Sequence, residues 1–218
     1  MKKILLLVCI LSITIGAKAQ LFGKHYDEGY YYDSVGIKHT GLISWSPPAK
    51  SIFGNKGDHI YFKTDKKAEQ IKLKENQISS FAIKNDSARM DSFVVAKNKD
   101  FIKAPFLHVL LDNDVKIYGF TMISSSGGGM MPGAGGNMVF MPGFSSNDTK
   151  YYYGEDTDHT TRLDKKNFIE VMSKALASKP YVVKRVQDKT FKLSKLNELL
   201  YFYRTDNYPE SMQPRNNY

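Results

Sequence analysis

The chain has 218 residues, a formal net charge of +9 and one cysteine, Cys9. A chain of this length can bury one hydrophobic core, and a single cysteine excludes an internal disulfide. The lysines are scattered and lack the clustering with stacking aromatic residues that is typical of nucleic-acid binding. Composition therefore predicts one folded domain, with no nucleic acid among its partners.

The first 19 residues have the layout of a cleaved secretory signal peptide. Lys2 and Lys3 precede an apolar run over residues 4–15, and residues 17–19 (Ala-Lys-Ala) offer small side chains at a cleavage site. The apolar run is too short to span a bilayer as a helix. We expect cleavage before Gln20 and a mature chain without a transmembrane span.

Export would change both the charge and the thiol content of the protein. Loss of the signal removes three lysines and Cys9, which leaves 28 basic against 22 acidic residues and no thiol. Such a chain has no disulfide and no cysteine nucleophile, so a hydrophobic core or a partner must stabilise it. We expect a protein that is periplasmic, outer-membrane-associated or secreted, with an oligomeric state that the sequence leaves open.

The segment from about residue 26 to residue 155 predicts an antiparallel sheet, or a partly open β-barrel or roll. Its clearest feature is a hairpin, in which residues 106–111 and 115–120 flank the turn-forming pair Asp112-Asn113. Alternating apolar and polar residues or aromatic-rich runs mark the other strands. These are expected at residues 30–32, 40–45, 58–64, 70–74, 78–83, 92–97 and 150–156.

The segment from about residue 162 to residue 204 predicts helices. Thr161 and Asp164 fit a capping box, and apolar residues from Phe168 onward recur at helical spacing. Pro180 can begin a second helix, with a strand as the alternative, and Ser194 can cap a third.

Strands followed by helices predict a single α+β domain over residues 20–204. The tail over residues 205–218 is polar, contains two prolines, and is expected to be disordered.

Short motifs in this order resemble those of a family of small exported proteins from Bacteroidetes-type bacteria. The resemblance covers roughly residues 26–204 and implies export and strands before helices, but no activity. Its motifs are Gly29-Tyr30, Gly41-Leu42-Ile43, residues 60–63 (IYFK), the Ile78 to Phe81 spacing, the hairpin at 106–118, the tyrosines at 151–153, Pro180 and Tyr203. Residues 124–147 depart from the family pattern and look like a loop insertion.

This insertion is rich in glycine and methionine. A phosphate-binding loop would need a following Lys-Ser/Thr and a helix, and the sequence has neither here. Three other interpretations remain. It is a disordered insertion, a segment that contacts a partner or membrane, or a site where thioethers bind Cu(I). The candidate binding residues are Met130, Met131, Met138, Phe140 and Met141.

An acidic stretch at residues 154–164 is a second candidate site. Glu155, Asp156 and Asp158 could bind a divalent cation, although the spacing of an EF-hand loop is absent. The alternative is a polar turn whose acidic residues complement the dipole at the start of the following helix.

No nucleophile elbow or metal-binding histidine spacing occurs. We therefore expect no catalytic residues, no cofactor, and a non-catalytic envelope or binding protein whose partner is an envelope protein or surface component. The alternative functions are a hydrolase acting on envelope or glycan material, with Asp156 or Glu155 as its carboxylate, and Cu(I) binding by the methionines.

Overall fold

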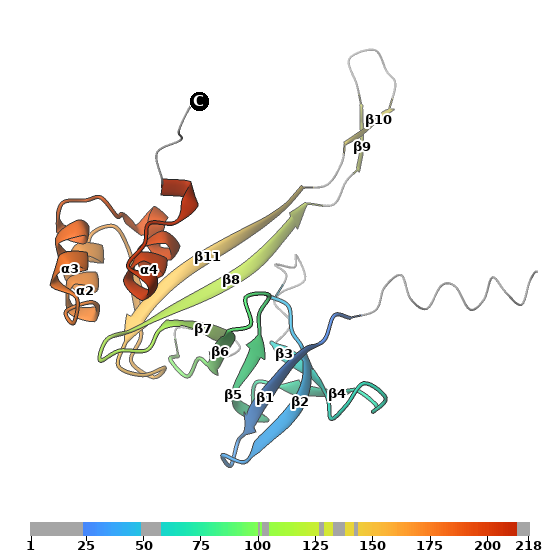
Figure 1. Ribbon diagram of the computed structural model, residues 1–218. Coiled ribbons are helices and arrows are strands. Elements are labelled where there is room, and N and C mark those ends of the chain that lie inside the picture. Colours follow the sequence, from blue (N-terminus) through green and yellow to red (C-terminus); the bar gives the residue numbers. More distant parts are fainter. Residues whose placement is uncertain are drawn as a thin grey trace, which may run out of the picture.

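The computed structural model describes residues 24–48, 58–99, 101, 105–126, 129–132, 138–141 and 144–212, and it describes side chains outside residues 125–145. The expected signal peptide at residues 1–19 and the last six residues of the expected tail lie outside these ranges. Strands occupy the N-terminal part of the chain and helices the C-terminal part (Figure 1). The predicted α+β class is therefore confirmed.

Ten strands form one open antiparallel sheet, in the order β12-β11-β8-β7-β6-β5-β1-β2-β3-β4. β12 and β4 are its two edges, so the antiparallel sheet of the prediction is present in its open form. The strands are β1 (Asp27–Asp33), β2 (Lys38–Ser44), β3 (His59–Lys63), β4 (Ile71–Lys74), β5 (Ile78–Lys84), β6 (Met90–Val95), β7 (Phe106–Leu111), β8 (Lys116–Ser126), β11 (Phe144–Gly154) and β12 (Thr161–Leu163).

The predicted hairpin at residues 106–120 is confirmed as β7 and β8. His108 lies opposite Gly119 and Leu111 opposite Ile117, with a bulge between Val109 and Leu111. The hairpin turn also anchors the helices, because the Asn113 side chain donates to the Ala175 carbonyl at 2.8 Å and to the Tyr203 hydroxyl at 3.0 Å.

Strands β1 to β7 enclose a core of mainly aromatic side chains, which we call the strand core. Three of its rings lie directly opposite one another on adjacent strands, because Tyr31 pairs with Phe81 and Phe81 pairs with Phe93. Phe81 and Phe93 are stacked, with ring centroids 4.7 Å apart. The buried residues of the strand core are Tyr31, Ile43, Ile60, Phe62, Ile78, Phe81, Phe93, Val95 and Phe106.

A buried carboxylate joins β3 to β7 across the strand core. Asp58, only 5% exposed, accepts hydrogen bonds from Trp45 Nε1 at 3.0 Å, the His59 amide at 2.9 Å and the Phe106 amide at 3.1 Å. Burial raises the pKa of Asp58 to about 6, although these hydrogen bonds oppose the shift. One side chain thus connects two strands that are not neighbours in the sheet.

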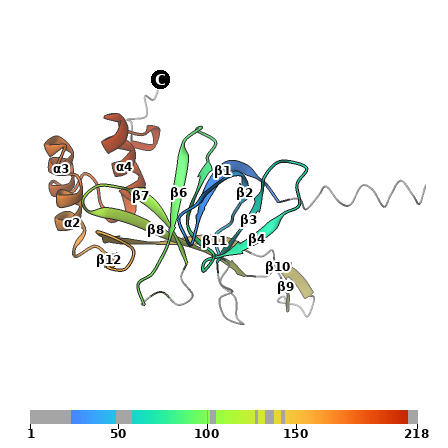
Figure 2. The same ribbon diagram turned by 90° about the horizontal axis from the view of Figure 1, so that it is seen from below.

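Three helices pack against the other end of the sheet (Figures 1 and 2). They are α2 (Phe168–Ala175), α3 (Pro180–Gln187) and α4 (Leu196–Thr205), with the short 3₁₀ helices η2 (Leu193–Lys195) and η3 (Glu210–Met212) around α4. Helical spacing buries Phe168 and Met172 in α2 and Val182 and Val186 in α3. The helix expected after Pro180 is confirmed, and its strand alternative is wrong.

The caps of these helices differ from the prediction. Thr161 belongs to β12, where it pairs with Tyr153, so the capping box at Thr161 and Asp164 is wrong. The reciprocal pair lies three residues later: Asp164 accepts from the Asn167 amide at 3.2 Å, and Asn167 Oδ1 accepts from the Asp164 amide at 2.8 Å. Ser194 lies within η2, and α4 begins without a side-chain cap.

The helices and the adjoining strands share a second core, the helical core. Its buried residues are Leu111, Ile117, Leu163, Phe168, Val171, Met172, Ala175, Leu176, Val182, Val186, Phe191, Leu196, Leu199, Leu200 and Phe202. The first residues of the expected disordered tail belong to this unit. Tyr208 stacks on Phe202 with ring centroids 4.6 Å apart, and Met212 packs against the same core. The disorder expected from residue 205 is therefore wrong up to residue 212, because two apolar anchors interrupt the polar sequence.

The expected loop insertion at residues 124–147 is also corrected in its described part. β8 and β11 pair from Lys116 and Gly154 out to Ser126 and Phe144, and β9 (Gly129–Pro132) pairs with β10 (Met138–Met141) in a separate two-stranded sheet. Figure 1 shows this ribbon extending away from the body of the protein. Backbone pairing satisfies donors and acceptors whatever the side chains are, so the serine-rich ends of β8 and β11 form strands without an apolar pattern that would predict them.

No helix in the described part of the chain combines the length and the apolar character needed to cross a membrane.

Candidate functional site

The sheet opens between two of its central strands. β6 and β7 pair at only three positions, from Phe93 and His108 to Val95 and Phe106. β6 begins earlier, at Met90, and β7 continues to Leu111, so these parts of the two strands lie outside the registered pairing. Figure 2 shows β6 running at a steep angle to β7. Residues of both strands line two adjoining cavities, which together we call the β6–β7 cleft.

Arg204, near the end of α4, reaches into this cleft. Its guanidinium Nη2 donates a hydrogen bond to the carbonyl of Leu110. Leu110 is the extra residue of the bulge in β7, where ladder pairing is interrupted. The last helix therefore supplies a donor where the sheet leaves a backbone acceptor, and this contact fixes the guanidinium at the centre of the cleft.

Two cavities meet at this contact. One, of about 370 Å³, is lined by polar side chains that include Arg89, Asp91, His108, Asn197 and Tyr201. The other, of about 350 Å³, is lined by Tyr30, Tyr32, Met90 and Ser92 among others. Arg204 and Leu110 line both. Each volume is at the lower end of the range of small-molecule sites, which is roughly 300–1,000 Å³.

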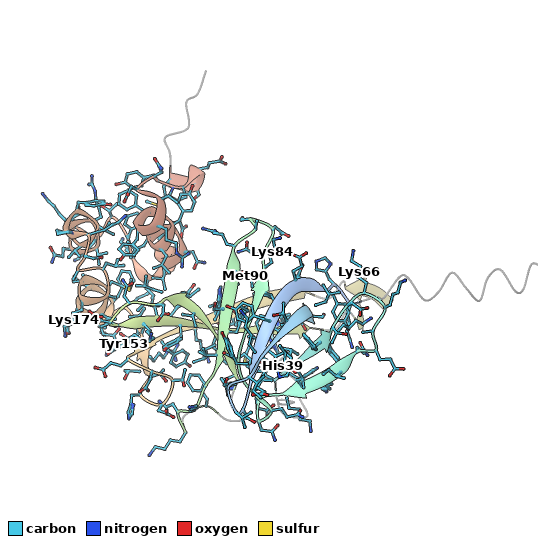
Figure 3. The ribbon with its side chains drawn as sticks, turned by 60° about the horizontal axis from the view of Figure 1, so that its bottom comes forward. His39, Lys66, Lys84, Met90, Tyr153 and Lys174 are labelled. Carbon is cyan, nitrogen blue, oxygen red and sulfur yellow. The ribbon has the colours of Figure 1, made fainter. Side chains whose placement is uncertain are left out.

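Figure 3 places Met90 on β6 between the two ends of the molecule, with Tyr153 and Lys174 on the helical side and His39 and Lys66 on the side of strands β1 to β4. The cleft thus lies at the junction of the strand core and the helical core. One end of it is polar and the other is rich in apolar and aromatic groups.

A histidine and an aspartate face each other in the larger cavity. His108 Nε2 lies 3.6 Å from Asp91 Oδ1, which accepts a hydrogen bond from the Asn85 side chain at 3.1 Å. The His108 ring stacks on Phe93, with centroids 4.8 Å apart. Burial lowers the pKa of His108, and the charge of Arg204 adds to this effect while Asp91 opposes it. His108 is therefore neutral at pH 7.

The larger cavity carries more positive than negative charge. Within the part of the chain that the structure describes, neither Arg89 nor Arg204 forms an ion pair, and Asp91 is the only carboxylate in the lining. Removal of water from its surroundings lowers the pKa of Arg204, and the nearby charge of Arg89 lowers it further, while the charge of Asp91 opposes both effects. Two guanidinium groups that repel each other, form no ion pair among the described residues and share their cavity with a single carboxylate favour binding of an anion.

The methionine-rich candidates fall in the ribbon. Phe140 lies opposite Met130, Met138 opposite Pro132 and Met141 opposite Gly129, and Met131 pairs with Val139. The side chains of all five candidates lie outside the described ones. Whether the thioether groups converge on a copper ion therefore stays a prediction.

The acidic candidates lie in the turn between β11 and β12, where all three side chains are exposed. The Asp156 carboxylate accepts from the amides of Asp158 and His159, both at 2.8 Å, and contacts His159 Nδ1 at 3.0 Å. The contact with His159 lowers the pKa of Asp156 and raises that of His159. The Asp156 carboxylate therefore shapes its own turn by binding backbone amides, and the three carboxylates of Glu155, Asp156 and Asp158 do not belong to any group of described residues that could hold a metal ion.

Across the described residues, no three His, Cys, Asp or Glu side chains are grouped closely enough to hold a metal ion. The residues of the β6–β7 cleft were not candidates from the sequence. Arg89 and Asp91 precede or begin β6, His108 lies in β7, and Arg204 follows almost a hundred residues later in α4. Only the tertiary fold brings them together, and no local motif marks them.

No family model, curated protein or solved structure matches the chain.

Proposed function

We propose that the chain is an exported, non-catalytic binding protein of the cell envelope, in which the β6–β7 cleft holds a small acidic ligand. The observation that carries this proposal is the pair Arg89 and Arg204, which form no ion pair among the described residues and line one cavity with a single carboxylate, Asp91. A guanidinium group presents a planar set of N–H donors that matches a carboxylate or phosphate.

The rest of the lining suggests the shape of the ligand. Asn197 and Tyr201 add polar groups beside the arginines, whereas Tyr30, Tyr32 and Met90 offer aromatic and thioether surface at the other end. We expect an organic anion with its acidic group at Arg204 and a ring or apolar portion toward Met90. A few polar groups that fix orientation on an otherwise apolar wall are typical of ligand sites.

The cellular part of the proposal depends on the sequence. The layout of residues 1–19 supports export to the periplasm, the outer membrane or the exterior, and the mature chain would then have no thiol to oxidise there. Fractionation of cells that express the full chain would test this. A product that retains residues 1–19 in the cytoplasm would contradict export.

Ligand binding can be tested by isothermal titration with a panel of aromatic and aliphatic carboxylates and phosphates at low ionic strength. The variant Arg89→Gln/Arg204→Gln should bind any hit at least about tenfold more weakly, because each charge-assisted hydrogen bond contributes roughly 1.5–3 kcal/mol. The control Arg162→Gln/Arg185→Gln removes the same charge from exposed positions outside the cleft. Equal loss in both variants would contradict a specific site.

A hydrolase is the second candidate function, and the His108–Asp91 contact favours it. Neutral His108 could accept a proton while Asp91 orients its ring, as a general base requires. Incubation with envelope glycans and ester substrates tests this, with His108→Gln as the control. Turnover that His108→Gln abolishes would favour an enzyme over a binding protein.

A further inference from the structure

A third cavity lies in the helical part of the protein, and its lining shares no residue with the β6–β7 cleft. It has a volume of about 340 Å³ and lies where the start of α2 meets the segment between α3 and η2. Its lining combines four apolar side chains with three lysines: Phe168, Ile169, Phe191 and Leu193, with Lys165, Lys189 and Lys192. We call it the lysine-rimmed pocket.

The floor of this pocket is apolar and firmly held. Phe168 and Phe191 are 3% and 1% exposed, so they belong to the helical core, whereas Ile169 remains 37% exposed beside them. An exposed isoleucine next to two buried rings leaves apolar surface that a ligand could cover. Covering such surface is favourable by about 25 cal/mol per Å².

The rim is cationic without compensation. Among the described residues, Lys165, Lys189 and Lys192 form no ion pair, and no carboxylate lines the pocket. The two nearest acids in sequence are engaged by backbone groups: Asp164 accepts from the Lys166 amide at 2.7 Å, and Asp188 accepts from the Thr190 amide at 3.0 Å. The lining itself thus carries three positive charges and no negative one, while the carboxylates of Asp164 and Asp188 stay charged next to it in sequence.

The backbone at Lys189 supports a role for its side chain. Lys189 follows α3 with φ of 62°, in the left-handed region where helices commonly end on glycine. Glycine would adopt this conformation without strain, whereas lysine adopts it at a cost. A strained residue at this position is understandable if its ammonium group is needed at the rim.

We infer that the lysine-rimmed pocket binds an amphipathic carboxylate with one hydrocarbon chain of medium length. The apolar floor receives the chain, and the three ammonium groups attract the carboxylate. The volume lies near the lower limit of ligand sites, roughly 300–1,000 Å³, which suits a single chain and excludes a complete two-chain lipid.

Isothermal titration with decanoate below its micellar concentration tests the inference. Decanoate should bind, whereas decyltrimethylammonium and decyl maltoside, with the same chain but no negative charge, should not. Lys165→Gln/Lys189→Gln/Lys192→Gln should weaken binding by at least about tenfold, because each exposed charge contributes up to roughly fivefold. The control Lys66→Gln/Lys67→Gln/Lys72→Gln removes equal charge from the opposite end of the protein and should bind normally.

The variant Lys189→Gly separates ligand binding from folding. It should keep or raise the melting temperature, because it relieves the left-handed strain, and yet weaken decanoate binding by about twofold to fivefold. A merely structural role of Lys189 would leave the affinity unchanged. Ile169→Asn should weaken decanoate binding, because it removes an apolar contact with the hydrocarbon chain of the ligand. Ile71→Asn changes an exposed isoleucine on β4 and should leave the affinity for decanoate unchanged.

Three results would overturn the inference. These are equal affinity for decanoate and decyl maltoside, loss of decanoate binding in Arg89→Gln/Arg204→Gln with the lysine variants unaffected, and binding to phosphatidylglycerol vesicles without binding to free decanoate. The first would remove the role of charge, the second would move the ligand to the β6–β7 cleft, and the third would replace the free ligand by a membrane surface. The proposed function of the β6–β7 cleft is tested independently, because the affinities of the carboxylates and phosphates are compared between wild type and Arg89→Gln/Arg204→Gln.

Discussion

The two larger cores of the described part of this protein are built in different ways. The strand core takes its residues from six strands spread over residues 27–111 and is dominated by stacked or edge-on rings such as Phe81, Phe93 and Phe106. The helical core takes most of its residues from one continuous stretch after Leu163 and is dominated by aliphatic side chains. The first depends on pairing between distant segments, whereas the second forms largely from neighbours in sequence.

The difference explains where the β6–β7 cleft lies. β6 contributes to the strand core through Phe93 and Val95, while β7 ends in the helical core at Leu111. The two strands therefore pack against different cores, and their pairing ends after three residue pairs. Polar groups line the space between the two strands. The bulge at Leu110 leaves a backbone carbonyl without a ladder partner, and Arg204 donates a hydrogen bond to it.

Cavity-forming substitutions in each core show whether the two halves unfold together. Phe81 is 1% exposed and Leu199 is fully buried. Phe81→Ala should lower the free energy of unfolding by about 3–5 kcal/mol and Leu199→Ala by about 2–5 kcal/mol, because each removes buried surface and leaves a void. Chemical unfolding followed by Trp45 fluorescence for the strand core and by far-ultraviolet circular dichroism for the helices gives both values.

One cooperative unit predicts that both probes shift together in both variants. If Phe81→Ala moves only the fluorescence transition and Leu199→Ala only the helical one, the halves are separate folding units that meet at the cleft. Ile71→Ala, at a residue that is 47% exposed, is the matched surface control and should change little.

The strand core contains a buried carboxylate, Asp58, whereas all the buried residues of the helical core are apolar. Asp58→Ala should cost about 2–3 kcal/mol, because it leaves the Trp45 indole N–H and the Phe106 amide buried without acceptors. Asp58→Asn keeps the shape and one acceptor oxygen, so it should cost less. The comparison uses chemical unfolding at pH 7, and equal stability of Asp58→Ala and wild type would show that Asp58 does not join β3 to β7.

The same carboxyl group should make stability depend on pH. Its pKa is about 6 in the folded state, above the ordinary value of 3.8, because burial disfavours the charged form. Between these values the folded state binds a proton that the unfolded state does not, so the stabilisation is complete below pH 3.8 and is lost as the pH rises through 6. Its size is at most about 3 kcal/mol, from 1.36 kcal/mol per pKa unit.

The difference in unfolding free energy between wild type and Asp58→Asn isolates this contribution. Exposed acids with lowered pKa, such as Asp156 and Asp206, contribute the opposite slope, but they are present in both proteins and cancel. The difference should grow in favour of wild type from pH 7 to pH 5. A constant difference would mean that Asp58 titrates normally.

The sequence predicts the elements of both halves better than their connections. Alternation identified strands such as residues 70–74, and helical spacing identified α2, because both signals are local. The strand order could not be derived, since β5 lies beside β1 and not beside β4. The pairing of residues 124–126 with residues 144–146 was missed because their serines carry no apolar alternation. The capping box was wrong because Thr161 belongs to β12.

The candidate sites were harder to predict than the fold, for a related reason. Met130 and Asp156 drew attention as members of unusual local stretches, whereas Arg89, His108 and Arg204 are ordinary residues in ordinary elements. Their chemistry arises from a strand bulge, a steep turn of the sheet and the end of a distant helix. A single sequence contains no local pattern that predicts which distant residues the tertiary fold brings together.

The segment after α4 tests how far the helical core extends. Tyr208→Ala removes a ring that stacks on Phe202 and lies 6.1 Å from the Phe191 ring. It should lower stability by about 1–2 kcal/mol, from lost aromatic contact and apolar burial. Amide hydrogen exchange should accelerate in α4 and leave β1 to β5 unchanged. Unaltered exchange in α4 would return this segment to the disordered tail of the sequence prediction.

The smallest expected effect lies in the turn between β5 and β6, beside the cleft. Ala88 has φ of 58°, and the Asn85 side chain holds the turn by accepting from the Arg89 amide at 3.0 Å. Ala88→Gly should stabilise the protein by about 0.5–1 kcal/mol, because relief of left-handed strain outweighs the added freedom of the unfolded chain.

In each half, then, a left-handed residue other than glycine adjoins a proposed binding site: Ala88 precedes Arg89, and Lys189 lies on the lysine rim. The two differ in where the functional group is. Lys189 carries its own ammonium group, so replacement by glycine should weaken binding, whereas Ala88 only orients its neighbour. Ala88→Gly should therefore raise the melting temperature while ligand affinity at the cleft, measured by titration, stays within about twofold, since the Asn85 contacts still fix Arg89. A larger loss of affinity would show that the strained turn itself positions the arginine.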